Sequence, residues 1–245
     1  TKVLTNLVSD AKTRDSNNTI LQKQFPGGVL SLVGANSARG FRRVSRRIVL
    51  FDETDGYPAS AGTEGDQIKL GIARTQYFWN RKIVAGSTRT IKDFSRIERL
   101  FEQSNQRRYY VPCCHCGHMQ YLRWPNMRWQ DDDPSTASYA CEECGVLIPH
   151  SKKRWMVERG EWRATQPSNG RHAGFHIWAA YSYSPNAEWS NLVEEFLLSK
   201  NDPEQLKTWI NTTLGECWED EYASKVGADG LMERAAVEKY EKGVP

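Results

Sequence analysis

The sequence lacks the features of a membrane protein or a secreted protein. Nowhere in its 245 residues is there an apolar run approaching the roughly 18 to 20 residues that cross a bilayer. The N-terminal stretch TKVLTNLVSDAKTRD contains no apolar signal-peptide core. Five of the six cysteines crowd around two Cys-x-x-Cys pairs, which favours a metal site in a reducing compartment over disulfides. We therefore expect neither a membrane location nor secretion.

Charge excess, repeats and low-complexity tracts are also missing. The formal net charge is only +3, so composition alone does not demand a nucleic-acid partner. No internal repeat or biased tract occurs, which excludes solenoid and linker-like architectures. Hydrophobic residues make up 39% and charged residues 26%, which is enough for a packed core. The sequence does not begin with Met, and we expect it to start within a longer protein.

Short apolar runs alternate with helical patterns in the first part of the chain. Residues 1–25 favour a helix followed by the start of a strand. Three further strands and one helix are predicted, at 27–35, 48–53, 81–90 and 67–79 respectively. Apolar strands separated by helices are typical of an α/β domain with a parallel sheet.

The stretch IVLFDE (48–53) is expected to be a buried strand that ends abruptly in two carboxylates. This is the form of the Walker B motif of P-loop ATPases, in which a rigid strand holds an aspartate beside Mg²⁺ and the nucleotide phosphates. Asp52 would then contribute to the Mg²⁺ shell, and Glu53 would polarise the attacking water. A strand that ends in an acidic turn is the simpler alternative, and it is common.

Two neighbouring features strengthen the ATPase interpretation. Arg39, in the loop before this strand, could reach a phosphate charge, although it could also be a solvated arginine. Ser87 and Thr88, at the end of the next predicted strand, could sense the γ-phosphate or simply cap a helix. No G-x-x-x-x-G-K-[ST] phosphate loop occurs, so we expect this chain alone not to bind ATP tightly or to be active.

Two cysteine pairs form a candidate metal site. Cys113, Cys116, Cys141 and Cys144 supply four thiolates, which Zn²⁺ binds tetrahedrally in closed structural sites. Cys114 could replace Cys113, but Cys113 gives the two-residue spacer and a knuckle with Gly117. We expect a structural zinc ribbon. His115, His118 and His150 are spare candidate ligands, and Cys217 is expected to be a free, buried thiol.

Basic and aromatic residues alternate around these knuckles. The stretches QRRYY (106–110), YLRWP (121–125) and KKRW (152–155) could stack bases and hold phosphates. The alternative is that their aromatic residues form the small core of the ribbon.

The last part of the chain contains two predicted helices. Residues 154–165 and 174–185 are expected to be extended. Trp189, Leu192, Val193, Phe196 and Leu197 lie on one helical face. A second helix is predicted to begin with Asp202 as N-cap and to end at Gly215; a charged tail follows from Glu219.

These stretches together resemble a known family. VLFDETDGYP, EGD (64–66), the run STRT..DFSRIERLFEQSNQRRYYVPC-CHCG, and GFHIWAAYSYSP followed by DPEQLKTWINTTLGECWED are similar to the large terminase subunit of tailed phages, the lambda-like GpA family. The resemblance extends from about Arg39 to Tyr240. Members of this family package viral DNA into an empty procapsid by ATP-driven translocation, and a C-terminal nuclease domain cuts concatemeric DNA.

The resemblance implies a role for each candidate residue. Asp52 and Glu53 would be the Walker B pair, Ser87–Thr88 the motif that couples hydrolysis to DNA movement, and Arg39 an arginine finger. Four nearby arginines are alternative candidates for the arginine finger: Arg42, Arg43, Arg46 and Arg47. Arg89 departs from the family pattern, because a proline often occupies that position.

The resemblance also implies cofactors, partners and domains. It implies ATP, Mg²⁺ and structural Zn²⁺, and it implies double-stranded viral DNA, the small terminase subunit, the portal of the procapsid and a homo-oligomeric motor ring in the host cytoplasm. The expected fold is α/β, a partial P-loop (ASCE-type) ATPase parallel sheet with an inserted four-cysteine zinc ribbon and a following helical segment. The expected domains are an ATPase part (1–105), a zinc ribbon (106–153) and a strand with helices (154–245) leading to a nuclease domain that is absent.

Two other functions remain open at this stage. One is a DNA translocase ATPase of helicase-like type. The other is a non-enzymatic zinc-ribbon adaptor that binds nucleic acid, in which the Asp-Glu pair is merely structural.

Overall fold

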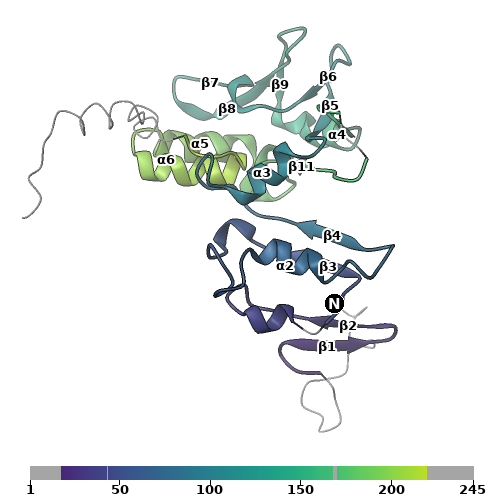
Figure 1. The fold of residues 1–245 in the computed structure, drawn as a ribbon. Helices are drawn as coiled ribbons and strands as arrows, with labels where there is room; N and C mark the ends of the chain where they lie inside the picture. Colours follow the sequence, from purple (N-terminus) through teal and green to yellow (C-terminus); the bar gives the residue numbers. More distant parts are fainter. Residues whose placement is uncertain (1–17, 43, 168–169, 220–245) are drawn as a thin grey trace, which may run out of the picture. The chain divides into compact units, whose positions relative to one another are not determined.

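The computed structural model describes residues 18–42, 44–167 and 170–219, and the chain divides into two compact units (Figure 1). The first unit ends at Gly86 and the second begins at Ser87. The helix expected near the N-terminus lies largely outside the described residues, as does most of the charged tail. None of the described helices is both long and apolar enough to span a membrane.

The first unit contains two small sheets. Strands β1 (Gln22–Phe25) and β2 (Gly28–Ser31) form an antiparallel hairpin, and β3 (Ile48–Phe51) pairs in parallel with β4 (Lys82–Ala85). The parallel pairing of the Asp-Glu strand with the next strand confirms the mixed α/β prediction. The strand expected at 27–35 is shorter and belongs to the hairpin.

Helix α2 (Gln67–Ala73) covers one face of the β3–β4 pair (Figure 1). Asp66 begins the helix as its N-cap, accepting a hydrogen bond from the Lys69 backbone N–H at 2.8 Å. A Cβ atom at Gly71 would lie 2.4 Å from the Phe51 ring, so only glycine allows this close approach of helix and strand. The helix ends at Ala73, earlier than the predicted residue 79.

The opposite face of the β3–β4 pair is exposed within the described residues. Ile48 is 45% exposed, Leu50 66% and Val84 44%. The strand was expected to be buried, but this holds for one face only, because α2 covers only the side on which Phe51 lies.

The second unit is built on two sheets that share one core. In the first sheet, β5 is central: β10 pairs with it antiparallel on one side, β11 in parallel on the other, and β6 pairs with it antiparallel further along. These strands are β5 (Arg107–Pro112), β6 (Met119–Tyr121), β10 (Glu161–Arg163) and β11 (Phe175–His176). The second sheet is antiparallel, with β7 (Met127–Gln130), β8 (Asp133–Ala140) and β9 (Leu147–Pro149).

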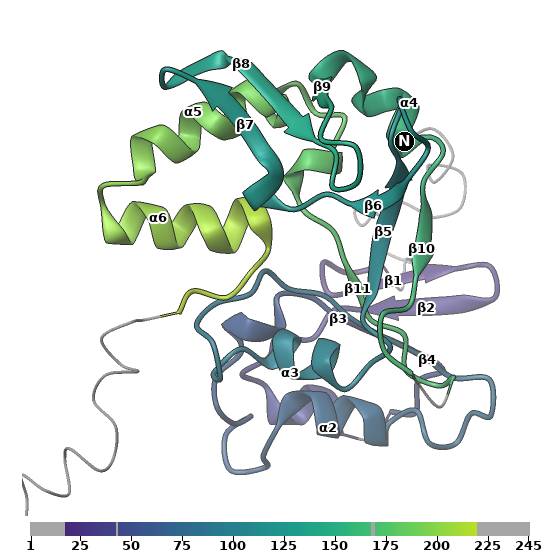
Figure 2. The ribbon, with the colours of Figure 1, turned by 90° about the horizontal axis from the view of Figure 1, so that it is seen from above.

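Two long helical segments close the second unit. Helix α5 (Trp189–Ser199) lies beside α6 (Pro203–Trp209), and β7 and β8 lie along α5 (Figures 1 and 2). Asp202 caps α6 through its carboxylate, which accepts the Glu204 backbone N–H at 3.0 Å. The helix continues as a π-helix (Ile210–Leu214) and stops at Gly215, whose φ of 63° is left-handed. Both predicted helices are confirmed.

Two extended segments were predicted wrongly. Lys153–Val157 forms a short helix, α4, before the strand β10, because Lys153 and Met156 are spaced to bury one helical face. The segment 174–185 keeps only the two residues of β11 as strand. It then turns through a short 3₁₀ helix at Ala179–Tyr181, which directs Trp178 and Tyr181 into the core.

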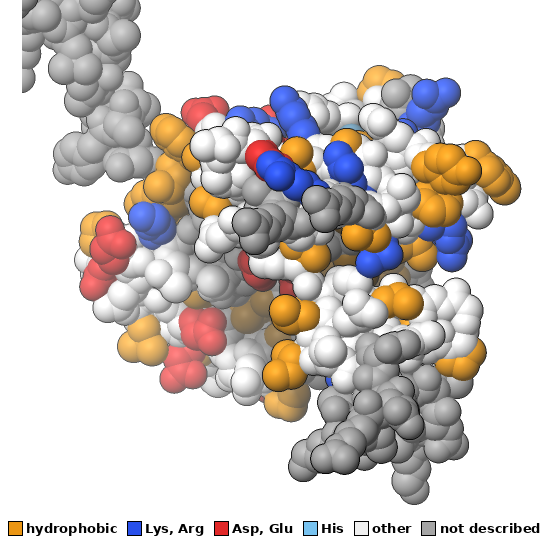
Figure 3. Space-filling view, turned by 60° about the horizontal axis from the view of Figure 1, so that its bottom comes forward, with side chains coloured by type: hydrophobic (Ala, Val, Ile, Leu, Met, Phe, Trp, Pro, Cys, Tyr) orange, Lys and Arg blue, Asp and Glu red, His pale blue; other side chains and the backbone are white. Residues whose placement is uncertain are grey.

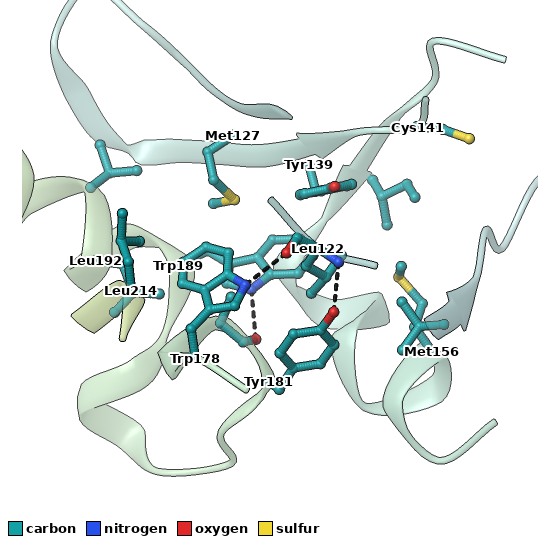
Figure 4. Packing of buried hydrophobic residues seen from close by; sticks show 14 of the residues in the cluster. Leu122, Met127, Tyr139, Cys141, Met156, Trp178, Tyr181, Trp189, Leu192 and Leu214 are labelled. Atoms are coloured by element: carbon teal, nitrogen blue, oxygen red, sulfur yellow. Dashed lines mark hydrogen bonds between the residues drawn. The ribbon is translucent and has the colours of Figure 1, made fainter. Parts of the chain in front are cut away.

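Aromatic side chains with satisfied polar atoms hold the core of the second unit together (Figure 4). The Trp178 indole N–H donates to the Leu122 carbonyl at 2.8 Å, and the Leu122 N–H donates to the Tyr181 hydroxyl at 2.6 Å. That hydroxyl in turn donates to the Tyr109 carbonyl at 2.7 Å. Trp189 is fully buried, and its indole N–H donates to the Ala180 carbonyl at 3.2 Å. These three large rings are thus buried with their polar atoms paired.

This core crosses the boundaries proposed from the sequence. Cys113, Tyr139 and Ile148, from the cysteine-rich segment, belong to the same buried cluster as Trp189 and Leu192 from α5. The cysteine-rich segment therefore packs as part of the second unit. The division at residues 105 and 153 stays a prediction about domain organisation.

A buried histidine joins the first sheet of the second unit to the end of the π-helix. The Nε2 atom of His176 lies 3.1 Å from the Leu214 carbonyl and 3.0 Å from that of Gly215, and its Nδ1 atom contacts the Arg108 guanidinium. Nε2–H therefore donates to the helix end, while Nδ1 accepts from Arg108. Burial first, and the positive charges of Arg108 and Arg89 next, lower the pKa of His176 to about 3.

We expect this histidine to make folding sensitive to mild acid. Its folded pKa, near 3, lies below the ordinary value of 6.5, so the stability it contributes is present above pH 6.5 and is lost as pH falls. Between pH 7 and pH 5 the free energy of unfolding should fall by about 2 kcal/mol from this group. Denaturant titration at several pH values measures the change. His176→Gln should flatten the dependence in this window, and an equal slope in both proteins would contradict the assignment.

Candidate functional site

The two carboxylates follow directly from strand β3. Asp52 and Glu53 are exposed, immediately after the buried Phe51. The backbone around them is fixed to the next strand: the Gly86 N–H donates to the Phe51 carbonyl at 2.9 Å, and the Thr54 N–H donates to the Gly86 carbonyl at 3.3 Å. The carboxylates therefore lie at the carboxyl edge of a parallel strand pair, where ligands bind in open α/β sheets.

Glu53 has an unusual backbone conformation. Its φ of 51° and ψ of 53° place it in the left-handed region, which a non-glycine residue adopts at a cost of about 1 kcal/mol or more. Glu53 is also the N-cap position of a 3₁₀ helix (Thr54–Gly56). The next side chain, Thr54, is fully buried, and its hydroxyl has no hydrogen-bond partner among the described residues. The left-handed backbone of Glu53 and the unpaired Thr54 hydroxyl both cost folding free energy. Such unfavourable features are typical of functional sites.

Ser87 and Thr88 follow Gly86 directly in the chain and are the first residues of the second unit. The Ser87 hydroxyl donates to the Thr88 carbonyl at 2.9 Å. Arg89 follows two residues after Ser87 in the chain, and its side chain is largely buried. Its guanidinium lies 4.9 Å from the Phe101 ring centre and 4.0 Å from the Glu98 carboxylate. Arg89 is therefore built into the second unit, which explains how a residue other than proline is accommodated here.

The arginines before β3 have different roles in the structure. Arg39 lies in a short 3₁₀ helix (Ala38–Phe41), and its side chain is outside the described part. Arg42 pairs with Glu64, and Arg46 donates to the Ser31 hydroxyl at 2.9 Å. Arg47 is exposed. The described contacts thus engage Arg42 and Arg46 in local structure and leave the choice of a phosphate-contacting arginine as a prediction.

The four predicted cysteines come together in one cluster. Their sulfur atoms all lie within 4.8 Å of one another, with Cys113–Cys144 at 3.9 Å and Cys116–Cys141 at 3.7 Å. A tetrahedral site with metal–sulfur bonds of about 2.3 Å has sulfurs about 3.8 Å apart, so the cluster has the dimensions of a zinc site. Cys114, exposed, is not part of this cluster, and neither are the exposed His115 and His118.

Both cysteine pairs form the same backbone knuckle. The Gly117 N–H donates to the Cys113 carbonyl at 3.0 Å, and the Gly145 N–H donates to the Cys141 carbonyl at 3.1 Å. Both glycines have positive φ, 76° and 67°, which side chains disfavour. The His115 backbone N–H also points at the Cys113 sulfur, 3.4 Å away, as expected for a donor that stabilises a thiolate. The spacing of the glycines is what distinguishes Cys113 from Cys114 in the sequence.

The remaining histidine and cysteine candidates have other surroundings. His150 accepts the Trp189 backbone N–H at 3.2 Å through Nδ1 and so caps helix α5. Cys217 is partly buried and unbridged, and burial followed by the Glu98 carboxylate raises the pKa of its thiol to about 12. Neither residue belongs to the four-cysteine cluster.

The aromatic residues near the knuckles divide between core and surface. Trp124 packs against Trp129, Trp178, Phe196 and Trp209, so the tryptophan of YLRWP belongs to the core. Tyr110 and Tyr121, by contrast, are half-exposed, with ring centres 5.5 Å apart. The alternation of basic and aromatic residues in the sequence could not predict which aromatic side chains are buried. It does not show which face of a strand packs against the rest of the unit.

Comparison with known proteins gives two family matches. Residues 1–162 match the model described as phage terminase large subunit gpA, ATPase domain, and residues 172–245 match the terminase large subunit gpA endonuclease domain. The expectation that the nuclease domain is absent is therefore wrong, since the helical segment after β11 corresponds to part of it.

Two curated relatives cover nearly the whole chain. The terminase large subunit of Enterobacteria phage P21 is 34% identical over 96% of this chain, and that of Escherichia phage lambda is 31% identical over the same share. The chain spans 39% of the length of each relative. No solved structure matches the chain. With the ATPase-domain model covering well over half of its residues, the chain belongs to the phage terminase large subunit gpA family.

Proposed function

We propose that this chain forms part of a DNA-packaging motor, which couples ATP hydrolysis to translocation of double-stranded DNA into a procapsid. The observation that carries the proposal is the carboxylate pair Asp52–Glu53 at the carboxyl edge of the β3–β4 pair, within a segment that matches the gpA ATPase domain. The P-loop architecture is part of the proposal, because the sheet before the carboxylates consists of β3 and β4 alone within the described residues.

The donor set at this edge fits Mg²⁺–ATP chemistry. Carboxylate oxygens are ligands that Mg²⁺ prefers, and Asp52 would complete the shell of an ion bridging the nucleotide phosphates. When bound, Mg²⁺ neutralises charge that develops on the phosphates. Glu53 would orient the attacking water and accept its proton, and its left-handed backbone sets the direction in which the carboxylate leaves the strand.

Coupling to DNA would start at Ser87 and Thr88. The Gly86 backbone is hydrogen-bonded to the residues on both sides of the carboxylate pair, so a change at the γ-phosphate could be passed to Ser87, the next residue in the chain. Arg39 or a neighbour up to Arg47 would stabilise phosphate charge. A phosphate-binding loop, the small terminase subunit, the portal and further copies of the subunit would complete the machine.

The cysteine cluster would hold a structural zinc ion. Four thiolates close the coordination sphere and leave no position for a substrate. Cys113 and Cys141 are also buried in the core of the second unit, so the ion would fix the knuckles to that core. The chemistry therefore lies at β3 and not at the cysteines. A nucleic-acid adaptor without ATPase activity is the competing function, and it predicts that the carboxylates do not matter.

Glu53→Gln should abolish ATP hydrolysis in a polypeptide extended to the length of its relatives. Loss of the general base should lower kcat by at least about 10²-fold, while nucleotide binding persists because the charge change leaves the phosphate ligands in place. Phosphate release in the presence of duplex DNA measures the rate. The matched control is Asp55→Asn, which neutralises a carboxylate two residues away and should retain the rate. Undiminished hydrolysis by Glu53→Gln would rule out the ATPase proposal for this strand.

Cys141→Ser should release the metal. Elemental analysis of the purified chain should find about one zinc per molecule, and the variant should lose it together with thermal stability, because metal binding contributes directly to folding. Cys114→Ser is the control and should keep both the metal and the melting temperature. A Cys141→Ser protein that retains zinc and stability would contradict a four-thiolate site.

A further inference from the structure

One face of the first sheet in the second unit carries tyrosines and arginines. Along β5, Tyr109 and Val111 point to the core: Val111 is fully buried, and the Tyr109 hydroxyl donates to the Val157 carbonyl at 2.9 Å. Because side chains alternate along a strand, Arg108 and Tyr110 lie on the other face. The register places Tyr121 of β6 opposite Tyr110 and Arg163 of β10 opposite Arg108, so these side chains share that face.

The arginines on this face lie over the tyrosine rings. The Arg163 guanidinium carbon is 5.2 Å from the Tyr110 ring centre, and that of Arg123 is 5.4 Å from the Tyr121 ring centre. The Arg108 guanidinium carbon lies 5.7 Å from the Tyr121 ring centre and 5.1 Å from that of Phe101, and this arginine is partly buried. We call Tyr110, Tyr121, Arg123 and Arg163 the tyrosine–arginine face.

Each exposed arginine is held along one edge only. Arg123 donates from Nε and Nη2 to Glu142, at 2.8 and 2.6 Å, and Arg163 donates from Nε and Nη2 to Glu161, both at 2.7 Å. Among the described residues, no hydrogen bond uses the Nη1 group of either arginine. The side chains remain 49% and 44% exposed.

This arrangement suits an anion with several oxygen atoms. A guanidinium that is stacked on a ring and fixed by a carboxylate has already lost much of its side-chain freedom, so little more entropy is lost when it binds a ligand. Its free edge presents N–H donors in the fork geometry that matches phosphate. The repeated phosphates of a nucleic-acid backbone would offer an anion of this kind to each of the two arginines.

A large excess of positive charge is not what would attract an anion to this face. The net charge of the chain is only +3, and in Figure 3 the Lys and Arg side chains of the visible face are spread among hydrophobic ones. On the tyrosine–arginine face, Arg123 and Arg163 are matched by Glu142 and Glu161. Recognition would therefore depend on the placement of the two guanidinium groups and not on a large basic field.

We propose that the tyrosine–arginine face binds the phosphate backbone of double-stranded DNA. The proposal specifies a contact surface for the DNA partner named under the proposed function and rests on that function for its biological meaning. The binding itself requires neither ATP nor the carboxylate pair. It also gives the arginines Arg123 and Arg163 a role that their ion pairs with glutamate do not account for, since exposed pairs of this kind add little stability.

Binding of a labelled duplex of arbitrary sequence, measured without nucleotide at several salt concentrations, tests this surface. In the double variant Arg123→Ala/Arg163→Ala, affinity should fall several-fold at low salt. The slope of log affinity against log salt should become shallower by about 2, because each phosphate contact contributes about 0.9. Thermal unfolding and zinc content, measured in parallel, show that the variant is folded.

Control variants distinguish DNA binding by the tyrosine–arginine face from a general effect of positive charge. Arg154→Ala removes an arginine that is also paired with a glutamate, Glu158, but that lies on helix α4 away from the tyrosines; its salt slope should match that of the unchanged chain. Tyr110→Phe should bind DNA normally, whereas Tyr110→Leu, which removes the ring beneath Arg163, should weaken binding.

An unchanged salt slope in the folded double variant, or an equal loss in Arg154→Ala, would overturn the proposal. These outcomes do not depend on ATP hydrolysis, so the DNA surface can fail while Glu53→Gln still behaves as an ATPase variant should. The converse also holds, because DNA binding by this face is measured without nucleotide.

Discussion

The second unit depends on a short chain of hydrogen bonds in its core, in which Leu122 is held by the side chains of both Trp178 and Tyr181. Leu122 follows the first cysteine knuckle, whereas the two aromatic residues lie far along the chain, after β11. Because a buried indole or hydroxyl group without a partner costs about 1 to 3 kcal/mol, these contacts fix one arrangement of the two segments. The four-cysteine cluster is thereby attached to the helices that match the nuclease-domain model.

Under the proposed function, the residues that carry the chemistry are separate from those that hold the metal site. The cysteine cluster has the dimensions of a closed metal site and sits in a well-packed core, where an ion would add stability but meet no substrate. The carboxylate pair has the opposite character: it is exposed, follows a half-covered strand, and coincides with a left-handed glutamate and a buried unpaired hydroxyl in the described part of the chain. Natural proteins tolerate such local costs mainly where function requires them.

Sequence patterns predicted the elements that depend on local chemistry. The N-cap at Asp202, the stop at Gly215 and the two knuckle glycines are readable because capping and positive φ restrict the residue type. The segment at Lys153–Val157 was mistaken for a strand because its tryptophan and valine favour strands, while its helical burial depends on the core it meets. Likewise, only strand register shows that Tyr110 is on the surface and Trp124 is in the core. The nuclease domain was expected to lie beyond the chain, whereas the match to its model covers residues 172–245.

ATP chemistry at the end of β3 is the proposal on which the motor function rests. The most direct measurement is a structure of the chain, extended to the length of its relatives, with Mg²⁺, ADP and a metal-fluoride analogue of the γ-phosphate. We predict a Mg²⁺ ion beside Asp52 and a water within hydrogen-bond distance of both Glu53 and the analogue. A nucleotide bound away from this strand edge, or a Glu53 carboxylate directed away from the analogue, would contradict ATP hydrolysis at this site.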